Sequence, residues 1–337
     1  GCGRLLLEEA DQLGRTTVES RRIVVGRDMR PSSPALVAAL KEGLKAAGAD
    51  VVDVGLVDTP FIYFAVNHLD AAGGIQTTAS HNPIQYNGFK ISRVEAKPVG
   101  KGSGLEVIEA YAQESTGDKP PSGEELDADL WDTYRLHVHR FLHPDLLSGA
   151  RRIMVAVDAS NGMAGTFMPK VFGDVPGLDL VEINFENDRG VFVHEPNPLV
   201  ESNLRQVRDA VVHHGAAVGI CFDGDADRCM VVDERGTPVG CDLLTAWLAG
   251  RFLKAESGGS VVYDLRSSHS VPEIIESRGG VPHRSRVGHV FMKGKARETN
   301  AVFGGELSGH FYFRENFFAD SGAMAFAAVV SALLEEG

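Results

Sequence analysis

Three acidic residues alternate with two small residues in the second half of the chain. Gly224 and Ala226 separate Asp223, Asp225 and Asp227, so the three carboxylates can converge on one point in an extended or turning segment. Carboxylates that close together repel one another strongly unless a cation lies among them. Oxygen ligands without His or Cys in the loop favour Mg²⁺ over Zn²⁺. The segment is therefore a candidate magnesium site, and the alternative is an acidic, solvated turn.

The same aspartates also match the first, third and fifth positions of a calcium-binding EF-hand loop, with Glu234 at the twelfth. The match fails at the sixth position, where the sharp turn requires glycine and this chain has Arg228. It also fails in context, because strands are expected on both sides of the loop, at Ala217–Phe222 and Cys229–Asp233, where an EF-hand has helices. The sequence therefore argues against an EF-hand.

A serine and a lysine in an earlier segment are a second candidate for chemistry. Ser80 lies in a turn that ends with Asn82 and Pro83, where backbone N–H groups could hold an anion. A serine hydroxyl is a weak nucleophile unless a base activates it, and no Gly-x-Ser-x-Gly elbow surrounds Ser80, so a serine hydrolase is poorly supported. Lys90 is of interest because it lies in the same short segment. Taken alone, the two read as an ordinary turn serine and a surface lysine.

Glu306 and Ser308 lie between glycines in a third polar loop. A carboxylate acceptor and a hydroxyl so close together suit the vicinal hydroxyls of a sugar. Taken singly, this loop is weak evidence for any function.

The elements that must position these loops alternate between strand and helix. We expect strands at Arg22–Gly26, Val51–Val57 and Gly73–Thr77, with a helix that begins at Ser33 before a proline and ends near Gly48. The same order recurs twice more along the chain, which is typical of α/β units with mostly parallel strands. The further expected elements are a loop at Thr116–Asp129, a helix at Leu130–Leu142, a strand at Ile153–Val157, a helix that Ser202 caps and Gly215 ends, a helix at Asp242–Phe252, a strand at Ser260–Tyr263, helices at Ser270–Ser277 and Val290–Thr299, and a strand at Ala301–Phe303.

Each of the three polar loops follows a late strand of its unit. The loops are Thr78–Pro83, Asp223–Arg228 and Gly304–His310. In open α/β sheets, ligands bind outside the carboxyl ends of the strands. We therefore expect the three loops to form one composite site.

The composition argues against several classes of protein. The 337 residues include 33 Lys and Arg against 46 Asp and Glu, a net charge of −13, with 43% hydrophobic residues. This acidic balance, without a basic block, argues against nucleic-acid or anionic-membrane binding. The longest apolar runs, such as Ala323–Leu334, are shorter than the roughly 20 residues of a membrane span, and no signal segment opens the chain. We expect a cytoplasmic protein whose four cysteines are reduced thiols.

Together, in this order and spacing, the three loops resemble the α-D-phosphohexomutase family, in particular its phosphomannomutase/phosphoglucomutase members. Thr78–Pro83 is similar to the family's phosphoserine loop, Asp223–Arg228 to its Asp-Gly-Asp-x-Asp-Arg metal loop and Gly305–His310 to its sugar-recognition loop. The supporting matches are Val25–Asp28 with Arg30, Ser32 and Ser33, then Asp158–Gly162, Pro196–Pro198 and Gly288–His289.

The resemblance implies a fold of three similar mixed α/β domains. These are a phosphoserine-loop domain at residues 1–135, without the family's N-terminal strand, a metal-binding domain at residues 136–239 and a sugar-recognition domain at residues 240–337. The family's fourth domain, which carries an Arg-x-Ser-x-Thr-x-Pro phosphate loop, is expected to be absent from this chain.

The resemblance also implies a mutase mechanism. Ser80 would carry a phosphoryl group, and Ser80, Asp223, Asp225 and Asp227 would hold one Mg²⁺ against it. Transfer to a hexose phosphate, of mannose or glucose, would give a hexose 1,6-bisphosphate, which also serves as primer. The intermediate would reorient and return its other phosphate to Ser80, interconverting hexose 1-phosphate and hexose 6-phosphate.

Further site residues follow from the same resemblance. Arg228 would neutralise charge on the transferring phosphoryl group, Lys90 is the candidate general acid/base, and His289 and His310 would assist it. The implied substrate-binding residues are Glu306, Ser308, Arg27 and Arg266. The substrate is a small phosphosugar, and the protein is expected to be a monomer or a homodimer.

Three other functions stay open at this point. A phosphoglucosamine mutase is disfavoured, because those enzymes tend to have Gln in the position of Leu307 and Asp in that of Tyr86. A non-catalytic phosphosugar-binding remnant would fit the missing terminal parts but would not need Ser80, Lys90 and the aspartates together. A metal-dependent phosphatase would use water in place of the sugar hydroxyl.

Overall fold

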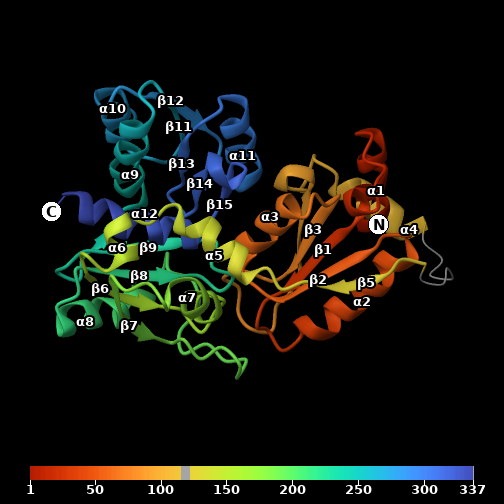
Figure 1. Cartoon of the computed structure of the whole chain (residues 1–337), viewed down its shortest axis with the longest axis horizontal. Helices are drawn as coiled ribbons and strands as arrows, with labels where there is room; N and C mark the ends of the chain where they lie inside the picture. Colours follow the sequence, from red (N-terminus) through yellow and green to blue (C-terminus); the bar gives the residue numbers. More distant parts are fainter. Residues whose placement is uncertain (115–121, 337) are drawn as a thin grey trace. The chain divides into compact units, whose positions relative to one another are not determined.

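The computed structural model describes residues 1–114 and 122–336, and these residues form three five-stranded sheets (Figure 1). Each sheet combines parallel strands with antiparallel ones. The chain divides into two compact units, the first comprising residues 1–79 and 84–130 and the second residues 80–83 and 131–337. The expected architecture of similar mixed α/β domains is confirmed, whereas the predicted boundaries after residues 135 and 239 stay a prediction.

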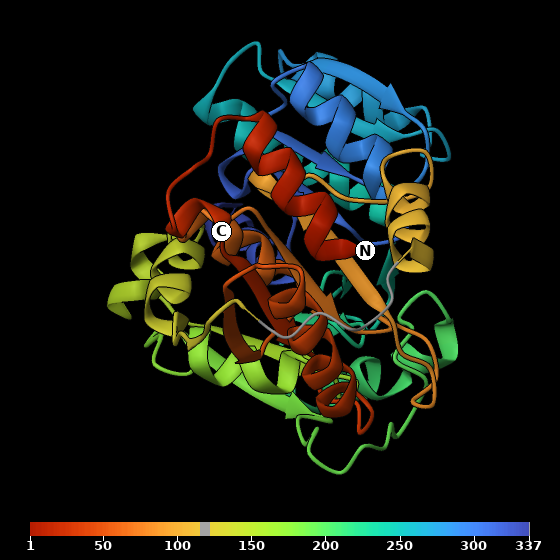
Figure 2. The same ribbon diagram turned by 90° about the vertical axis from the view of Figure 1, so that its right-hand side faces the viewer.

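The first unit contains one sheet, in the strand order β4-β3-β1-β2-β5. Its strands are β1 (Ile23–Arg27), β2 (Val51–Leu56), β3 (Gly73–Thr77), β4 (Phe89–Arg93) and β5 (Glu125–Asp127). Its helices are α1 (Cys2–Gln12), α2 (Ser33–Ala46), α3 (Thr59–His68) and α4 (Leu105–Glu114), with short 3₁₀ turns at Glu19–Arg21 and Val94–Ala96. Figure 2 shows α1 beside α4. The Tyr111 hydroxyl of α4 donates a hydrogen bond to Glu8 of α1.

Apolar side chains hold this sheet against its helices. Ile23 and Val25 of β1 are fully buried, and they share one core cluster with Leu6 of α1 and Leu44 of α2. The helix expected from Ser33 is present, but Ser33 does not cap it. Its hydroxyl instead donates to a buried carboxylate of the preceding loop, described below.

The second unit contains two sheets, in the orders β10-β9-β8-β6-β7 and β12-β11-β13-β14-β15. The strands of the first are β6 (Ile153–Asp158), β7 (Leu178–Ile183), β8 (Val218–Phe222), β9 (Cys229–Val232) and β10 (Pro238–Val239). The strands of the second are β11 (Ser260–Asp264), β12 (Val281–Ser285), β13 (Phe303–Gly305), β14 (Phe311–Phe313) and β15 (Ala319–Asp320). The helices are α5 (Trp131–His139), α6 (Pro144–Ser148), α7 (Ala164–Phe172), α8 (Arg205–His214), α9 (Cys241–Ala255), α10 (Ser270–Ser277), α11 (His289–Glu298) and α12 (Gly322–Glu336), with 3₁₀ turns at Glu201–Leu204 and Arg314–Asn316.

Helix α12 joins the two sheets of the second unit. It follows the second sheet in sequence, yet it lies beside β9 of the first (Figure 1). Phe326 packs its ring against Phe172 of α7 and Phe222 of β8. At its far end the Ser331 hydroxyl accepts the His143 N–H and donates to the Phe141 carbonyl. The apolar run that forms α12 therefore belongs to the protein core. None of the helices in the described part of the chain has the length and apolar character needed to cross a bilayer.

The three sheets share one connection that matters for function. In each, a strand that runs parallel to one neighbour turns back through a polar loop into an antiparallel strand on its other side. These hairpins are β3–β4, β8–β9 and β13–β14, and their loops are the three that the sequence singled out. The loops thus occupy equivalent positions in their sheets.

The structure corrects several expected elements. The expected loop Thr116–Asp129 is partly wrong, because β5 lies within its described part, while its first residues, up to Pro121, lie outside the described residues. Ser202 lies inside a 3₁₀ turn and caps no helix. The strand expected at Ala301–Phe303 begins two residues later. All four cysteines lie among the described residues as free thiols, three of them buried.

Candidate active site

The hairpin loop between β8 and β9 brings three carboxylates together in the second unit. Asp223, Asp225 and Asp227 are almost completely buried, and one oxygen of each lies within 4.8 Å of the others. Ala226 adopts a left-handed backbone conformation that tightens the turn (φ 59°). A Cβ atom on Gly224 would clash with the carbonyl oxygen of Ser80, so only glycine fits there.

Ser80 reaches this loop directly. Its hydroxyl donates a 2.9 Å hydrogen bond to Asp223 Oδ2. Its backbone is left-handed (φ 51°), a conformation that costs a non-glycine residue free energy and so marks a site worth attention. His81 places Nδ1 3.3 Å from the same hydroxyl. The structure therefore joins the serine and the aspartates that the sequence predicted to act together.

The three aspartates suit a hard divalent cation. Three buried carboxylates at this spacing repel one another, and a bound cation would offset that repulsion with oxygen ligands only. Asp227, His310 and Asp320 form a second group of this kind, but the fully buried Lys293 Nζ lies 2.6 Å from Asp320 Oδ1. Because an ammonium already neutralises that group, the aspartate loop is the candidate metal site among the described residues.

Arg228 and His310 connect this loop to the hairpin loop between β13 and β14. Their backbones pair as an isolated antiparallel bridge. Arg228 Nε lies 3.7 Å from Asp223 Oδ2, and His310 Nε2 lies 3.2 Å from Asp227 Oδ1. Burial opposes charge on His310, but the Asp227 carboxylate outweighs it and raises the histidine pKa. Two of the three predicted loops therefore meet within the second unit.

The Gly304–His310 loop is held by buried polar groups. Glu306 is buried and accepts hydrogen bonds from the Tyr312 hydroxyl and from the Gly288 N–H, at 2.6 and 2.8 Å. Ser308 Oγ lies 2.9 Å from His310 Nδ1. The two proposed sugar-binding side chains therefore lie next to His310.

Arg266 and His289 lie near the same loop. Arg266 Nη2 donates to the buried Asp264 Oδ2 at 2.7 Å, and the Leu307 N–H donates to that oxygen at 2.8 Å. One carboxylate thus fixes both the arginine and the loop backbone. His289 is exposed and begins α11, directly after Gly288.

Lys90 and Arg27 belong to the first unit. Lys90 lies on β4 opposite Gln76 of β3, and Arg27 is the last residue of β1, opposite Thr77. Both are half-buried at the end of the sheet where β3 leads into the Ser80 loop. Their predicted roles stay predictions.

A buried ion pair in the first unit supports the segment that leads into β4, a role that the sequence pattern did not indicate. Asp28 and Arg30 are fully buried, with Arg30 Nε 3.0 Å from Asp28 Oδ2. Arg30 Nη1 also donates to the Tyr86 carbonyl at 3.1 Å, and the Asn87 side chain donates to Ser33 Oγ at 2.9 Å. In the sequence, Asp28, Arg30 and Ser33 stood out only as part of a segment that matches the family, with no role assigned to them.

A hydrogen bond from the start of α7 also holds the aspartate loop, a role that the sequence pattern did not indicate. The Met163 N–H donates to the Gly224 carbonyl at 2.9 Å, at the start of α7. In the same turn, buried Asp158 accepts from His194 Nε2 at 3.0 Å. Burial lowers the pKa of His194, but the Asp158 carboxylate outweighs it, so the net pKa is raised.

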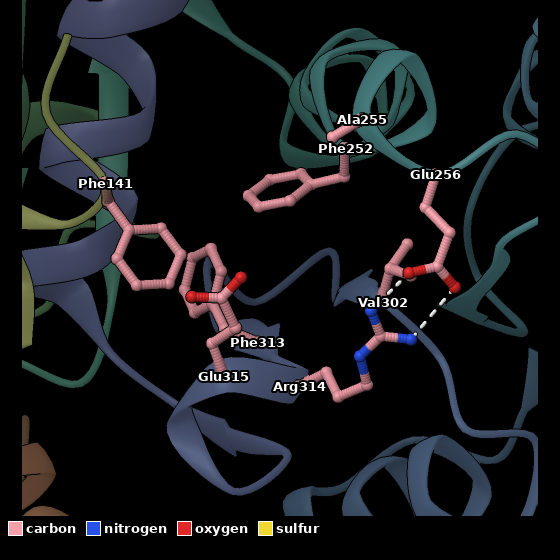
Figure 3. Close-up of a pocket in the computed structure, with 8 residues that line it drawn as sticks. All are labelled: Phe141, Phe252, Ala255, Glu256, Val302, Phe313, Arg314 and Glu315. Carbon is pink, nitrogen blue, oxygen red and sulfur yellow. Dashed lines mark hydrogen bonds and ion pairs between the residues drawn. The ribbon is translucent and has the colours of Figure 1, made fainter.

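A separate pocket lies at the other end of β14 (Figure 3). Its volume is about 250 Å³, and the Arg314–Glu256 ion pair flanks an aromatic wall. The lining residues are Phe141, Phe252, Ala255, Glu256, Val302, Phe313, Arg314 and Glu315. None of the predicted site residues is among them.

Comparisons with known proteins match this arrangement to one family. Three models match in order: phosphoglucomutase/phosphomannomutase α/β/α domain I at residues 6–118, domain II at 137–236 and domain III at 242–337. The phosphohexose mutases of Xanthomonas campestris pv. campestris (strain B100) are 37% identical over 316 residues, which are 94% of this chain and 70% of the relative. The phosphomannomutase of Escherichia coli K12 is 35% identical over 321 residues, 93% of this chain and 69% of the relative.

A solved structure agrees with the sequence relatives. A phosphoglucomutase/phosphomannomutase family protein from Burkholderia thailandensis superposes with a TM-score of 0.87 at 32% identity, covering 99% of this chain and 72% of the other. Sequence similarity, domain order and fold thus agree over nearly the whole chain. This protein belongs to the phosphoglucomutase/phosphomannomutase family.

Proposed function

We propose that this chain interconverts hexose 1-phosphate and hexose 6-phosphate, with mannose or glucose as the sugar, through a phosphoserine and a hexose 1,6-bisphosphate. Its family makes it a hexose phosphate mutase and hence an intramolecular phosphotransferase. One observation carries the detailed proposal: the Ser80 hydroxyl donates to Asp223 within the buried cluster of three aspartates. Ser80, which would carry the phosphoryl group, is thus hydrogen-bonded to the aspartate loop, which would hold the metal.

Asp223, Asp225 and Asp227, with an oxygen at Ser80, would hold one Mg²⁺, which would neutralise charge on the transferring phosphoryl group. Arg228 adds a guanidinium beside Asp223, where it would stabilise the same charge. The Ser80 oxygen–phosphorus bond breaks as a bond forms between phosphorus and the free hydroxyl of the substrate. That hydroxyl gives up its proton to a general base, for which Lys90 is the candidate.

His310 and His289 are proposed to assist the proton transfers. His310 is held between the Asp227 carboxylate and Ser308, which places its ring beside the aspartate loop. Glu306 and Ser308 would bind the sugar hydroxyls, with Arg27 and Arg266 as further substrate-binding residues. After the bisphosphate reorients, the other phosphate returns to Ser80. We further propose a cytoplasmic location and a monomer or homodimer.

Mutase assays with mannose 1-phosphate and glucose 1-phosphate, primed with glucose 1,6-bisphosphate, test this function. We expect turnover of at least one sugar, and label from a radioactive bisphosphate on Ser80. Ser80→Ala should remove both signals, whereas the exposed surface variant Ser122→Ala should retain them.

The outcomes separate the alternatives. Background turnover of both sugars without label on Ser80 would contradict the proposal and favour a binding protein. Phosphate release that exceeds isomer formation would favour a phosphatase. Turnover of glucosamine phosphate above that of mannose and glucose phosphates would favour a phosphoglucosamine mutase.

A further inference from the structure

The carboxylate of Glu306 is fixed from two sides by groups outside its loop. Tyr312 Oη donates to Oε2 at 2.6 Å, and the Gly288 N–H donates to Oε1 at 2.8 Å. Tyr312 lies on β14 and Gly288 precedes α11, so two elements of the second unit set the orientation of one side chain. Both Glu306 and Tyr312 are almost completely buried, so water competes little for these hydrogen bonds.

Tyr312 acts as a permanent donor. Its burial, reinforced by the Glu306 carboxylate, raises the pKa of the phenol well above its usual value. The hydroxyl therefore stays protonated and always donates to Glu306. Because each carboxylate oxygen can accept more than one hydrogen bond, both Glu306 oxygens retain capacity for a ligand hydroxyl.

His310 offers a competing partner for the same oxygen. Its Nδ1 lies 3.6 Å from Glu306 Oε2 and 2.9 Å from Ser308 Oγ. Without the Tyr312 hydroxyl, Glu306 Oε2 would lose its short hydrogen bond and could turn toward His310 Nδ1. Tyr312 thus keeps Glu306 Oε2 from approaching His310 Nδ1 more closely than 3.6 Å, and the histidine interacts with Ser308 and Asp227.

We propose that Tyr312 is a positioning residue that sets the affinity of the site for the hydroxyls of the sugar, by holding the Glu306 carboxylate in place. The proposal rests on the proposed function, because it assigns sugar hydroxyls as the ligand of Glu306. It adds a residue that touches no substrate yet controls one that does. Phosphoryl transfer that involves no sugar should not depend on Tyr312.

The test compares Tyr312→Phe with a matched control, Tyr134→Phe, which alters another fully buried tyrosine. Calorimetry with glucose 1-phosphate and mannose 1-phosphate measures sugar binding without requiring turnover. We expect Tyr312→Phe to weaken binding about tenfold and to raise KM more than it lowers kcat, because one hydrogen bond that orients a charged group is lost. Labelling of Ser80 by acetyl phosphate, which has no sugar hydroxyls, should stay at the wild-type rate.

A double-mutant cycle sharpens the test. Glu306→Gln should weaken sugar binding at least as much as Tyr312→Phe, and the double variant should show no further loss, because both changes remove one coupled function. Wild-type affinity in Tyr312→Phe, or additive losses in the double variant, would overturn the proposal. Equal slowing of the acetyl phosphate reaction would show a general structural role instead. A wild-type protein that binds both sugars without turning them over would contradict the proposed function and leave the Tyr312 test intact.

Discussion

Removal of the Arg30 guanidinium should destabilise the first unit in a way that depends on pH. Arg30→Met keeps an unbranched side chain but leaves Asp28 buried without its charge partner, which lies 3.0 Å away. Breaking a buried pair from one side costs about 3–5 kcal/mol. Asp28 Oδ1 still accepts from Ser33 Oγ and from the Arg30 N–H, so we expect about 3 kcal/mol, the lower end of that range.

The pH dependence follows from the Asp28 carboxyl. Burial already raises its pKa despite the hydrogen bonds from Ser33 and the charge of Arg30, and loss of Arg30 should raise it further. A carboxyl whose folded pKa lies above its unfolded value, about 3.9, destabilises the folded state increasingly as pH rises toward the folded pKa. The stability gap between Arg30→Met and wild type should therefore be smaller at pH 5 than at pH 8.

Denaturant unfolding at both pH values measures this gap. The exposed pair of Arg152 with Asp179 provides the control, because Arg152→Met should leave the unfolding midpoint almost unchanged. The double variant Asp28→Asn with Arg30→Met removes the buried charge and should recover a large part of the loss. A double variant no more stable than the single one, or a gap that is the same at both pH values, would refute this reasoning.

Two further predictions concern the second unit. Asp225→Asn should lower Mg²⁺ affinity at least about tenfold, because one of three anionic ligands is lost. Titration with Mg²⁺ measures the affinity of this variant and of the exposed control Asp209→Asn. Equal affinities in the two variants would exclude the aspartate loop as the metal site. Burial lowers the pKa of His194, but the Asp158 carboxylate outweighs burial, so the net pKa is raised. The ion pair of His194 with Asp158 therefore stabilises the folded state fully below the unfolded pKa of about 6.5, and this stabilisation is lost as pH rises through the folded pKa. His194→Gln should therefore lose stability relative to wild type at pH 5.5 and lose less at pH 9 in thermal unfolding scans, and a loss that grows with pH would contradict this.

Local sequence was sufficient for the central strands and the three loops. Strands such as β1 and β8 are short, mostly apolar runs, and nearly all of their residues are buried. Asp223, Asp225 and Asp227 lie within five residues of one another, so the turn between β8 and β9 alone can bring their carboxylates together. The local backbone sets the relative positions of residues that are close in sequence, so these motifs could be recognised without the fold and also indicated the family.

Three short edge strands were not predicted from the sequence. β5, β10 and β15 have two or three residues each, too few for an alternating pattern to stand out. Pairing with β2, β9 and β14 defines them, and that pairing is a property of the folded sheet. Helix α12 follows the third sheet in sequence, but aromatic contacts place it against the neighbouring sheet, and those contacts exist only in the folded protein.

The sequence by itself determined the family, the α/β architecture and the residues that the chemistry needs. Only the tertiary structure decided which hydrogen bonds hold these residues in place. They join Ser80 to Asp223, 143 residues apart in sequence, Arg30 to the Tyr86 carbonyl, and Tyr312 to Glu306. The physical reason is that a buried hydrogen bond requires two groups to be desolvated at one place, and the packing of distant elements sets that place.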